Sequence, residues 1–405
     1  MELVIHRGSK QIGGNIIEIR TDNARIALDC GINLPDLDDQ AQDEDDISIE
    51  GLMHGKSAFD AVLLSHHHGD HCGLMRRINK DIPIYASAIT KEILDVVSDF
   101  INKERPRIDH VLKPESRVKV KDIEILPIPV GHSARGALMF LIDSGGKSIL
   151  YTGDFSRVED KYFDRFGKVD VLICEGTNID FDIGMKEEEI EKKMIKLFQD
   201  APSHVFVLCS TTNIDRIQSV HQACIKTGRK MAVDPFAKAV LEKFPEINLD
   251  PKNAIGFVPR RVVIEENECC WNYLQKNKKF FRKREVIKKY EKIVFLVRVN
   301  YSMKYFLNVL NDLVNLKGTT LIYSIWRGYE NSNPTRDFLE NCRSLGIKRE
   351  NLHTSGHIYG SELKEFIERL DPKIIVPVHT VNAKKFKDRF PNTELLDDGE
   401  RFVIA

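Results

Sequence analysis

The sequence predicts an α/β protein built from two parts, and three observations lead to this prediction. Short runs rich in β-branched residues recur through the first 175 residues, with Gly, Asp or Asn between them, which is typical of packed sheets. Helical periodicity then takes over and alternates with apolar runs, as in a parallel sheet flanked by helices. After about residue 345 come a loop, one helical segment and one apolar run, which we expect to return to the first part.

The second part is expected to contain four helices and four strands. The helices are expected at 185–198, 213–227, 272–292 and 303–315, and the strands at 205–209, 232–233, 293–299 and 320–323. The returning segment is expected to carry a helix at 361–370 and a strand at 373–378. A chain of 405 residues has room for two cores, because single cores tend to split beyond about 250 to 300 residues.

The composition is that of a soluble globular protein, with 42% hydrophobic and 30% charged residues. The formal net charge of -1 creates no overall field toward nucleic acid or membrane, so any site for a polyanion must be local. Eight cysteines without a C-x-x-C pair argue against a disulfide framework and a zinc finger. No run approaches the roughly 20 apolar residues that span a bilayer. We therefore expect a cytoplasmic protein with reduced thiols and no membrane segment.

Two segments concentrate charge. The acidic stretch 35–50 lacks periodicity and is expected to form a solvated loop, although it would repel a phosphodiester if it covered a cleft. The basic stretch 276–292 could follow several phosphates of a nucleic acid, but a charge run on a helix is more often a solvated face.

Polar residues that can bind metal or transfer protons end six apolar runs of the chain. The runs 25–28, 61–65, 123–131, 148–153, 169–174 and 373–378 end at Asp29, His66, His132, Asp154, Glu175 and His379. A single histidine after a strand is usually a satisfied surface or core residue. Six such endings predict one site at a common edge of the sheets, because ligands of open sheets lie beyond strand ends for the same geometric reason.

The run from His66 to His71 predicts the start of a metal cage. His66 and His68 alternate in an extended segment, so they point the same way, and His67 faces the other side. Gly69 permits a tight turn that delivers Asp70 and His71 at the start of a helix near residue 72, aimed at a second ion. We expect no metal ligand at His67.

Three later residues complete this cage. His132 is expected to join the first site, His379 the second, and Asp154 to bridge the two ions. Two ions roughly 3.5 to 4 Å apart can hold a hydroxide between them and stabilise a displacement at phosphorus. Asp29 and Glu175 are expected to accept the free N–H of ligand histidines, although a capping or surface acid is nearly as probable for each alone. The nitrogen-rich ligands favour two zinc ions, with manganese as the alternative.

With these residues in place, the sequence resembles the metallo-β-lactamase superfamily. Asp29, the H-x-H-x-D-H run at 66–71, His132 and Asp154 follow the order of its core motifs. Glu175, His357 in H-T-S-G-H and His379 in P-V-H-T resemble motifs A, B and C of its β-CASP branch, which includes ribonuclease J and the cleavage and polyadenylation endonuclease. Nearly the whole chain takes part in this resemblance.

The resemblance implies an αββα metallo-β-lactamase sandwich with an inserted α/β β-CASP domain. The sandwich would take residues 1–182 and 346–405, and the inserted domain residues 183–345. The chain ends at Ala405, soon after motif C and without the additional C-terminal domain of ribonuclease J, so its oligomeric state stays open. Motif B is usually followed by a small residue, and Ile358 stands there instead, where it could narrow the approach to the metals.

The resemblance also implies substrate contacts. Ser355, Gly356 and His357 resemble the residues that contact phosphate, and a protonated His357 could assist the leaving oxygen, although a helix-capping histidine would show the same spacing. Ser210, Asn213 and Arg216 follow a strand and open a helix, where an anionic phosphate is favoured, but a plain helix cap explains the hydroxyls almost equally well.

These observations lead to the hypothesis of a metal-dependent ribonuclease, exonuclease or endonuclease, in which Asp70, Glu175 and His357 take part in catalysis of single-stranded RNA cleavage. A histidine at motif C accompanies RNA substrates in the family, so His379 favours RNA over DNA. Hydrolysis of a small ester, lactam or nucleotide at the same centre, a DNA nuclease, and a non-catalytic RNA-binding subunit are the alternatives. The intact ligand set argues against the last of these.

Overall fold

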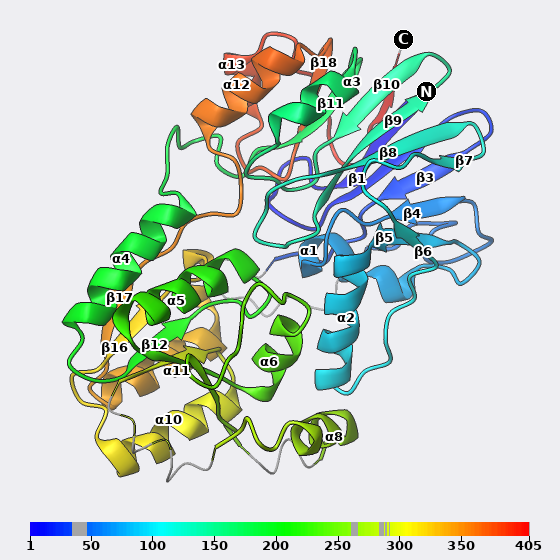
Figure 1. Cartoon of the computed structure of the whole chain (residues 1–405). Helices are drawn as coiled ribbons and strands as arrows, with labels where there is room; N and C mark the ends of the chain where they lie inside the picture. The colour runs from blue at the N-terminus through cyan, green and yellow to red at the C-terminus, as the bar shows by residue number, and fades with distance from the viewer. Residues whose placement is uncertain (35–46, 261–265, 283–286, 288–289, 291, 405) are drawn as a thin grey trace.

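The computed structural model describes residues 1–405 except 35–46, 261–265, 283–286, 288–289, 291 and 405. The strands of the described residues form three sheets, two of which face each other in the upper part of Figure 1, while the third occupies the lower part. The acidic stretch 35–50 falls mostly outside the described residues.

The first sheet has seven strands in the order β19-β1-β2-β3-β4-β5-β6. Their bounds are β1 (Glu2–Arg7), β2 (Ile16–Arg20), β3 (Arg25–Leu28), β4 (Ala61–Leu63), β5 (Ile84–Ser87), β6 (His110–Leu112) and β19 (Arg401–Val403). The second sheet has six strands in the order β18-β11-β10-β9-β8-β7. They are β7 (Val118–Val120), β8 (Ile123–Pro129), β9 (Leu138–Ser144), β10 (Lys147–Tyr151), β11 (Val171–Glu175) and β18 (Ile374–Val378). Each sheet thus takes one strand from the end of the chain.

Side-chain alternation explains why these two sheets stack. In β9, Phe140 and Ile142 point into the core between the sheets, whereas Met139 and Leu141 point to the other face of the same sheet. A strand buried on both faces reads as a continuous apolar run, as 138–142 does. The outer face of the second sheet is covered by α3 (Phe163–Phe166), α12 (Gly360–Leu370) and α13 (Lys384–Arg389), which share one apolar cluster with it.

The outer face of the first sheet packs against short helical segments and the helix that comes after β5. These are α1 (Gly69–Cys72), the 3₁₀ segment η1 (Met75–Arg77) and α2 (Ala88–Phe100). A further 3₁₀ segment, η2 (Asp160–Tyr162), leads into α3. The two stacked sheets with helices on both outer faces confirm the expected αββα sandwich.

The third sheet is parallel throughout, in the order β14-β13-β15-β12-β16-β17. Its strands are β12 (Val205–Leu208), β13 (Lys230–Val233), β14 (Ala254–Gly256), β15 (Ile293–Val297), β16 (Thr320–Tyr323) and β17 (Lys348–Asn351). One apolar cluster joins it to α4 (Glu187–Asp200), α5 (Ile214–Thr227) and α6 (Pro235–Leu241), and another joins it to α10 (Tyr301–Val314) and α11 (Asn333–Ser344). The remaining elements are α8 (Glu268–Lys276) and η3 (Arg327–Asn331). This is the expected inserted α/β unit.

Most expected elements of this unit are present, and one is wrong. The helix expected at 272–292 ends at Lys276, and residues 277–282 form turns and a bridge, while most residues between 283 and 291 lie outside the described part of the chain. Asn277 caps that helix end with a non-helical backbone, so the run of lysines does not extend one helix. The sequence also missed α2, α6 and α11. The domain limits at 182 and 345 stay a prediction, and β17, beyond the second limit, pairs with β16 of the third sheet.

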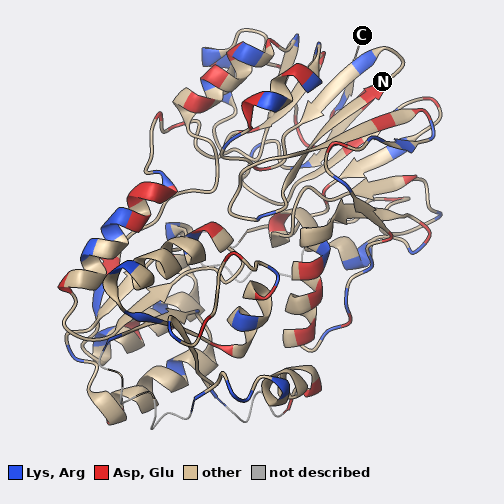
Figure 2. Ribbon diagram, viewed as in Figure 1, with Lys and Arg blue, Asp and Glu red and all other residues tan. Residues whose placement is uncertain are grey.

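The two parts touch through helices and ion pairs. Helix α2 lies beside α6 and α8 (Figure 1), and its Ile93 belongs to a core cluster of the third-sheet unit. Arg135, in the loop after β8, donates to Asp215 of α5 at 2.8 Å. Figure 2 shows that α4 begins with an acidic turn and carries its basic residues further along, whereas α12 carries both signs along its length. None of the helices in the described part of the chain has the length and apolar character needed to cross a bilayer.

Candidate metal centre

Six polar side chains at or close behind strand ends meet at one edge of the sandwich. Five of them follow a strand, namely Asp29 after β3, His66 after β4, His132 after β8, Asp154 after β10 and His379 after β18, and Glu175 is the last residue of β11. All six are buried. Side chains that are far apart in the sequence thus share one small volume, as expected from the strand endings.

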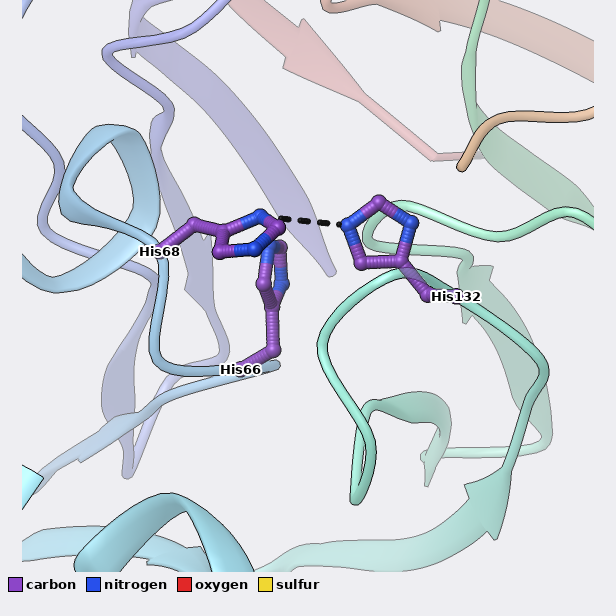
Figure 3. Close-up of side chains that lie close together, drawn as sticks. All are labelled: His66, His68 and His132. Carbon is purple, nitrogen blue, oxygen red and sulfur yellow. Dashed lines mark hydrogen bonds between the residues drawn. The ribbon is translucent and has the colours of Figure 1, made fainter. Parts of the chain in front are cut away.

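The first cluster holds three imidazoles. His66 and His68, from the loop after β4, meet His132, from the loop after β8, and their potential ligand atoms lie within 4.8 Å of one another. Nε2 of His132 lies 3.2 Å from Nδ1 of His68, and Figure 3 shows the three rings converging from two loops. Ligands of a tetrahedral zinc ion, each about 2.0 to 2.1 Å from the metal, would lie about this far apart.

The second cluster combines nitrogen and oxygen. Helix α1 carries Asp70 and His71 in its single turn, and they meet Asp154 and His379 within 4.8 Å. Nε2 of His379 lies 3.2 Å from Oδ2 of Asp70, and Nε2 of His71 lies 3.1 Å from Oδ2 of Asp154. The helix begins at Gly69, earlier than expected, and ends at Cys72.

Asp154 lies between the two clusters. Its Oδ2 atom is 3.8 Å from Nε2 of both His66 and His132 in the first cluster. The same oxygen is 3.6 Å from Nε2 of His379 in the second. One carboxylate oxygen within reach of ligands from both clusters is the arrangement that a bridging ligand needs, and we therefore propose Asp154 for that role.

The unpaired atoms of this site fit metal ions. Nε2 of His66, Nε2 of His71 and Oδ1 of Asp154 are buried and have no hydrogen-bond partner among the described residues. Leaving a buried polar atom unpaired costs free energy, which a coordinated cation would remove. The two groups supply mostly imidazole nitrogen with carboxylate oxygen, a set that suits zinc.

Asp29 orients the imidazole of His71 by a hydrogen bond. Its Oδ2 atom is 2.7 Å from Nδ1 of His71, and because a carboxylate only accepts, Nδ1 carries the proton and Nε2 is left to bind a metal. The hydroxyl of Tyr151 donates to the same oxygen at 2.6 Å, and the main-chain N–H of Ser65 donates to Oδ1 at 2.6 Å. Asp29 is thus fixed by three elements, as its expected role requires.

Backbone strain is located at two of these positions. Asp29 has a φ of 61° and His379 a φ of 52°, the left-handed region that residues other than glycine rarely adopt. Such conformations persist where surrounding contacts enforce them, and they are common at functional sites. Here they turn two side chains into the centre immediately after the strands end.

Groups for which the sequence analysis predicted no such role orient other ligand histidines. The carbonyl of Gly356 accepts a hydrogen bond from Nδ1 of His132 at 2.7 Å, and the hydroxyl of Thr177 lies 2.8 Å from Nδ1 of His379. Ser65 Oγ lies 3.0 Å from Nδ1 of His66. Thr177 is close in sequence to Glu175, and Ser65 is next to His66. This proximity was the only feature of the sequence that could have indicated their role.

Glu175 orients His357 instead of a metal-ligand histidine. Its two carboxylate oxygens lie 3.0 and 2.9 Å from Nδ1 of His357, and Oε1 also accepts from the main-chain N–H of Phe155 at 2.9 Å. Burial lowers the pKa of His357, but the carboxylates of Glu175 and Asp154 outweigh it and raise that pKa to about 9. Cations bound in the adjoining clusters would act in the opposite direction.

A cavity of about 470 Å³ opens beside the metal centre and is lined by the loop 354–357. Ser355, Gly356 and His357 face it together with His132 and Asn213. Its wall also includes five carboxylates, Asp182, Glu187, Glu188, Asp215 and Glu362. Four of these carboxylates form ion pairs with Lys or Arg side chains, which reduces the repulsion that an anionic substrate would meet.

The loop 210–213 and Arg216 differ in their surroundings. Ser210 is exposed, and Asn213 caps α5 by accepting from the main-chain N–H of Arg216 at 3.1 Å. The guanidinium of Arg216 is fully buried and donates to Glu187 of α4 at 2.8 Å. Its burial removes Arg216 from the cavity wall, so the structure does not support the expected phosphate contact by this side chain.

Two further expectations concern neighbours of ligand residues. His67 is buried and lies outside the groups of potential metal ligands among the described residues, and its expected lack of a metal-binding role stays a prediction. Ile358 packs into the apolar cluster beneath α12, with 5% of its surface exposed. Its side chain is therefore part of the core. The expectation that it narrows the approach to the metals is wrong.

Family comparisons agree with this fold and site. Residues 25–209 match the beta-lactamase superfamily domain, and residues 346–392 match the Zn-dependent metallo-hydrolase RNA specificity domain. The first match contains every member of the two clusters except His379, and the second contains His357 and His379.

Individual proteins show the same similarity. Ribonuclease J of Sinorhizobium meliloti is 22% identical over 421 residues, which cover 94% of this chain and 69% of that protein. Ribonuclease J of Mycobacterium tuberculosis H37Rv is 28% identical over 246 residues, or 56% of this chain and 43% of the relative. The chain therefore spans from under half to about two thirds of the length of these relatives. A crystal structure of a protein of unknown function from Enterococcus faecalis V583 superposes with a TM-score of 0.79 at 22% identity, covering 99% of both chains.

Fold and site together define a zinc-dependent metallo-hydrolase. Residues 25–209 match the beta-lactamase superfamily domain, and the chain is similar to the ribonucleases J over most of its length.

Proposed function

We propose that this protein is a metal-dependent ribonuclease that cleaves single-stranded RNA at the centre formed by its two clusters. The observation that carries the proposal is the placement of the loop 354–357 at the mouth of the metal centre, within the segment that matches an RNA specificity domain. The named activity of the relatives supports the same substrate class.

Divalent ions bound by the residues of the two clusters would activate water at neutral pH and supply positive charge next to the reacting phosphate. Asp70, His71, Asp154 and His379 would hold one ion, and His66, His68 and His132 the other, with Asp154 shared. The chain's own residues perform the remaining steps.

Ser355, Gly356 and Asn213 would receive the scissile phosphate at the cavity wall, where a hydroxyl, a main-chain segment and an amide face the same space. Because Glu175 accepts from Nδ1 of His357, the imidazole is held in one orientation with Nε2 available to the cavity. His357 would then donate a proton from Nε2 to the leaving oxygen, a step that typically contributes about 10²- to 10⁴-fold to the rate.

The proposed function also includes the strandedness of the substrate, the location of the protein and its assembly. We infer that the substrate is single-stranded, because an unpaired strand can place one phosphate in the cavity of about 470 Å³ beside the metal centre. All eight cysteines have free thiols, which accords with a cytoplasmic location. Assembly into a homo-oligomer stays a prediction that light scattering tests.

The decisive experiment uses purified, zinc-loaded protein and RNA labelled at either end, with a 5′ phosphate or a 5′ hydroxyl. Cleavage that disappears in an Asp70→Ala, His71→Ala variant supports the proposal, and the order of products separates exonuclease from endonuclease action. The protein would instead be a small-molecule hydrolase if the RNA stays intact while cyclic nucleotides, bis(p-nitrophenyl) phosphate or a lactam are hydrolysed. DNA cleavage under the same conditions would contradict the RNA preference.

A further inference from the structure

A second cavity, of about 370 Å³, lies at the C-terminal edge of the third sheet. Its lining comes from the ends of three adjacent strands: residues 208–212 after β12, Arg298 and Val299 after β15, and Ile325 and Tyr329 after β16. Phe236 of α6 and Thr335 of α11 complete it. Its volume lies within the range of roughly 300 to 1,000 Å³ that is usual for sites of small organic groups.

The topology of the sheet explains why a cavity forms there. The chain leaves β12 toward β13, which lies on one side of β12, and it leaves β16 toward β17, which lies on the other side. Because β12 and β16 are neighbours, their following connections diverge and leave a crevice beyond their C-terminal ends. In open parallel sheets, ligands bind at this type of switch point.

Arg298 is fixed in this cavity. Its NH1 group donates to Oγ1 of Thr211 at 3.1 Å and to Oδ1 of Asp234 at 3.2 Å, and its guanidinium lies 4.6 Å from the ring centroid of Phe236. Asp234 is buried and caps α6, so the guanidinium plane is fixed from both ends. The ion pair with Asp234 neutralises Arg298, which is the one charged side chain among the described lining residues.

The chemistry of the walls selects a flat, uncharged group. Leu208, Val299 and Ile325 provide apolar surface, and Phe236 and Tyr329 provide aromatic rings. A phosphate would find no unmatched positive charge in this described lining, whereas a nucleobase could stack on aromatic and guanidinium faces.

The position of the cavity connects it to the metal centre. Ser210, Thr211 and Thr212 line this cavity, and Asn213, the next residue, lines the cavity beside His132 and His357. Tyr329 lies near enough to Asp70 for that carboxylate to raise the pKa of its phenol, after the larger effect of burial. The two cavities are therefore neighbours along the loop 210–213.

We propose that this cavity binds one nucleobase of the RNA strand whose backbone occupies the metal centre, with Arg298 and Phe236 as the surface on which the base stacks. The inference rests on the proposed function, because it names a subsite for the same substrate. Hydroxyls of the 210–212 loop supply hydrogen-bond partners at the base edge.

Photocrosslinking tests this subsite without any cleavage. The full chain, freed of metal with a chelator, is irradiated with a single-stranded RNA that carries 4-thiouridine at successive positions, and the crosslinked peptides are identified by mass spectrometry. We expect one position of the RNA to crosslink within 208–212, at Phe236, or within 325–329. Crosslinks found only elsewhere, or none at all, would overturn the subsite.

Two variants add an independent measurement. Val299→Trp fills the cavity and should raise the KM for RNA about tenfold, the effect of losing one stacked base, while the hydrolysis of bis(p-nitrophenyl) phosphate is unchanged. Val111→Trp adds the same side chain at an exposed position on β6 and should change neither. If Val299→Trp does not fold, Tyr329→Leu replaces it in the KM measurement, because this variant removes one aromatic ring from the cavity.

The results of these experiments distinguish failure of the base-binding subsite from failure of the proposed ribonuclease activity. Crosslinking in the cavity without cleavage by the metal-loaded protein would retain the subsite and refute the ribonuclease. Cleavage without crosslinking in the cavity, or with an unchanged KM in folded Val299→Trp, would refute the subsite alone.

Discussion

The carbonyl of Gly356 and the imidazole of His132 are joined by a 2.7 Å hydrogen bond that connects the substrate loop to a ligand of the first cluster. The two residues are 224 positions apart in the chain. Because the carbonyl can only accept, it fixes the His132 proton on Nδ1 and leaves Nε2 for the metal.

A Gly356→Ala substitution should therefore weaken the first metal site. A Cβ atom at this position would lie 2.6 Å from Ser133 Oγ and 2.9 Å from its main-chain nitrogen, so the loop must shift and withdraw its carbonyl. Zinc affinity of that site is expected to fall about 10- to 100-fold, as for other losses of a group behind a ligand. Competition titration with a zinc chelator measures this. Ser355→Ala, which leaves the carbonyl in place, should bind zinc like the wild type, and equal affinity in both variants would contradict the prediction.

Asp154→Asn should reduce the affinity for both ions. The residue lies within 3.8 Å of ligand atoms in both clusters, and the amide removes the negative charge that a bridging ligand supplies. Elemental analysis after dialysis should give fewer than two ions per chain. His68→Ala, which belongs to the first cluster only, should retain one ion. Two tightly bound ions in Asp154→Asn would show that another group bridges them.

Loss of the Glu175 carboxylate should slow RNA cleavage without loss of metal. Glu175→Gln retains the size of the side chain but weakens its hold on Nδ1 of His357, and we expect kcat to fall about 10²- to 10⁴-fold. His357→Ala should give a similar loss, and the double variant should be no worse than the single ones, because the two residues act as a unit. Additive losses, or a metal content below that of the wild type, would assign Glu175 to a different role.

Removal of Arg216 should destabilise the fold. Its fully buried guanidinium pairs with the partly exposed Glu187 and donates to the carbonyls of Ser324 and Thr354, and removing a buried hydrogen-bond partner typically costs about 1 to 3 kcal/mol. Urea unfolding of Arg216→Met should show this cost, and adding Glu187→Gln should recover part of it. A normal unfolding free energy with a raised KM for RNA would restore Arg216 as a phosphate contact.

Glu18 should make the stability depend on acid pH. Burial raises the pKa of Glu18, but hydrogen bonds from His6 and Arg25 outweigh burial and lower that pKa from 4.5 to about 2. A carboxyl group whose pKa is lower in the folded state stabilises the protein at pH values above its pKa in the unfolded chain. This stabilisation is lost as pH falls from about 4.5 toward 2. The effect is on the order of 3 kcal/mol, because one pKa unit corresponds to about 1.4 kcal/mol.

Denaturant unfolding of wild type and Glu18→Gln between pH 7 and pH 3 tests this dependence. The difference in the free energy of unfolding should be largest at neutral pH and shrink below pH 4.5. A difference that is constant over this range would show that the contribution of Glu18 is not electrostatic. Glu124→Gln, on an exposed position of β8, should be neutral throughout.

Periodicity predicted the packed sheets, the parallel α/β part and the grouping of the polar strand ends, because strand periodicity and the order of residues at strand ends are local properties. The αββα arrangement and the insertion of the second part were predicted from the family resemblance. The sequence did not predict α2, α6 and α11, and it extended the helix that ends at Lys276 through the basic stretch. A run of lysines suits a helix surface, but whether the helix continues depends on the apolar face available to it, which the tertiary structure decides.

The same division holds for the site. The sequence by itself determined which residue types could bind metal, since the spacing of His66, His68, Asp70 and His71 is set by a strand end and one turn of helix. Only the tertiary structure decided that Gly356 and Thr177 orient ligand histidines and that Arg216 is buried against Glu187. Those contacts join residues far apart in the chain, and their geometry depends on how the packed sheets and loops meet.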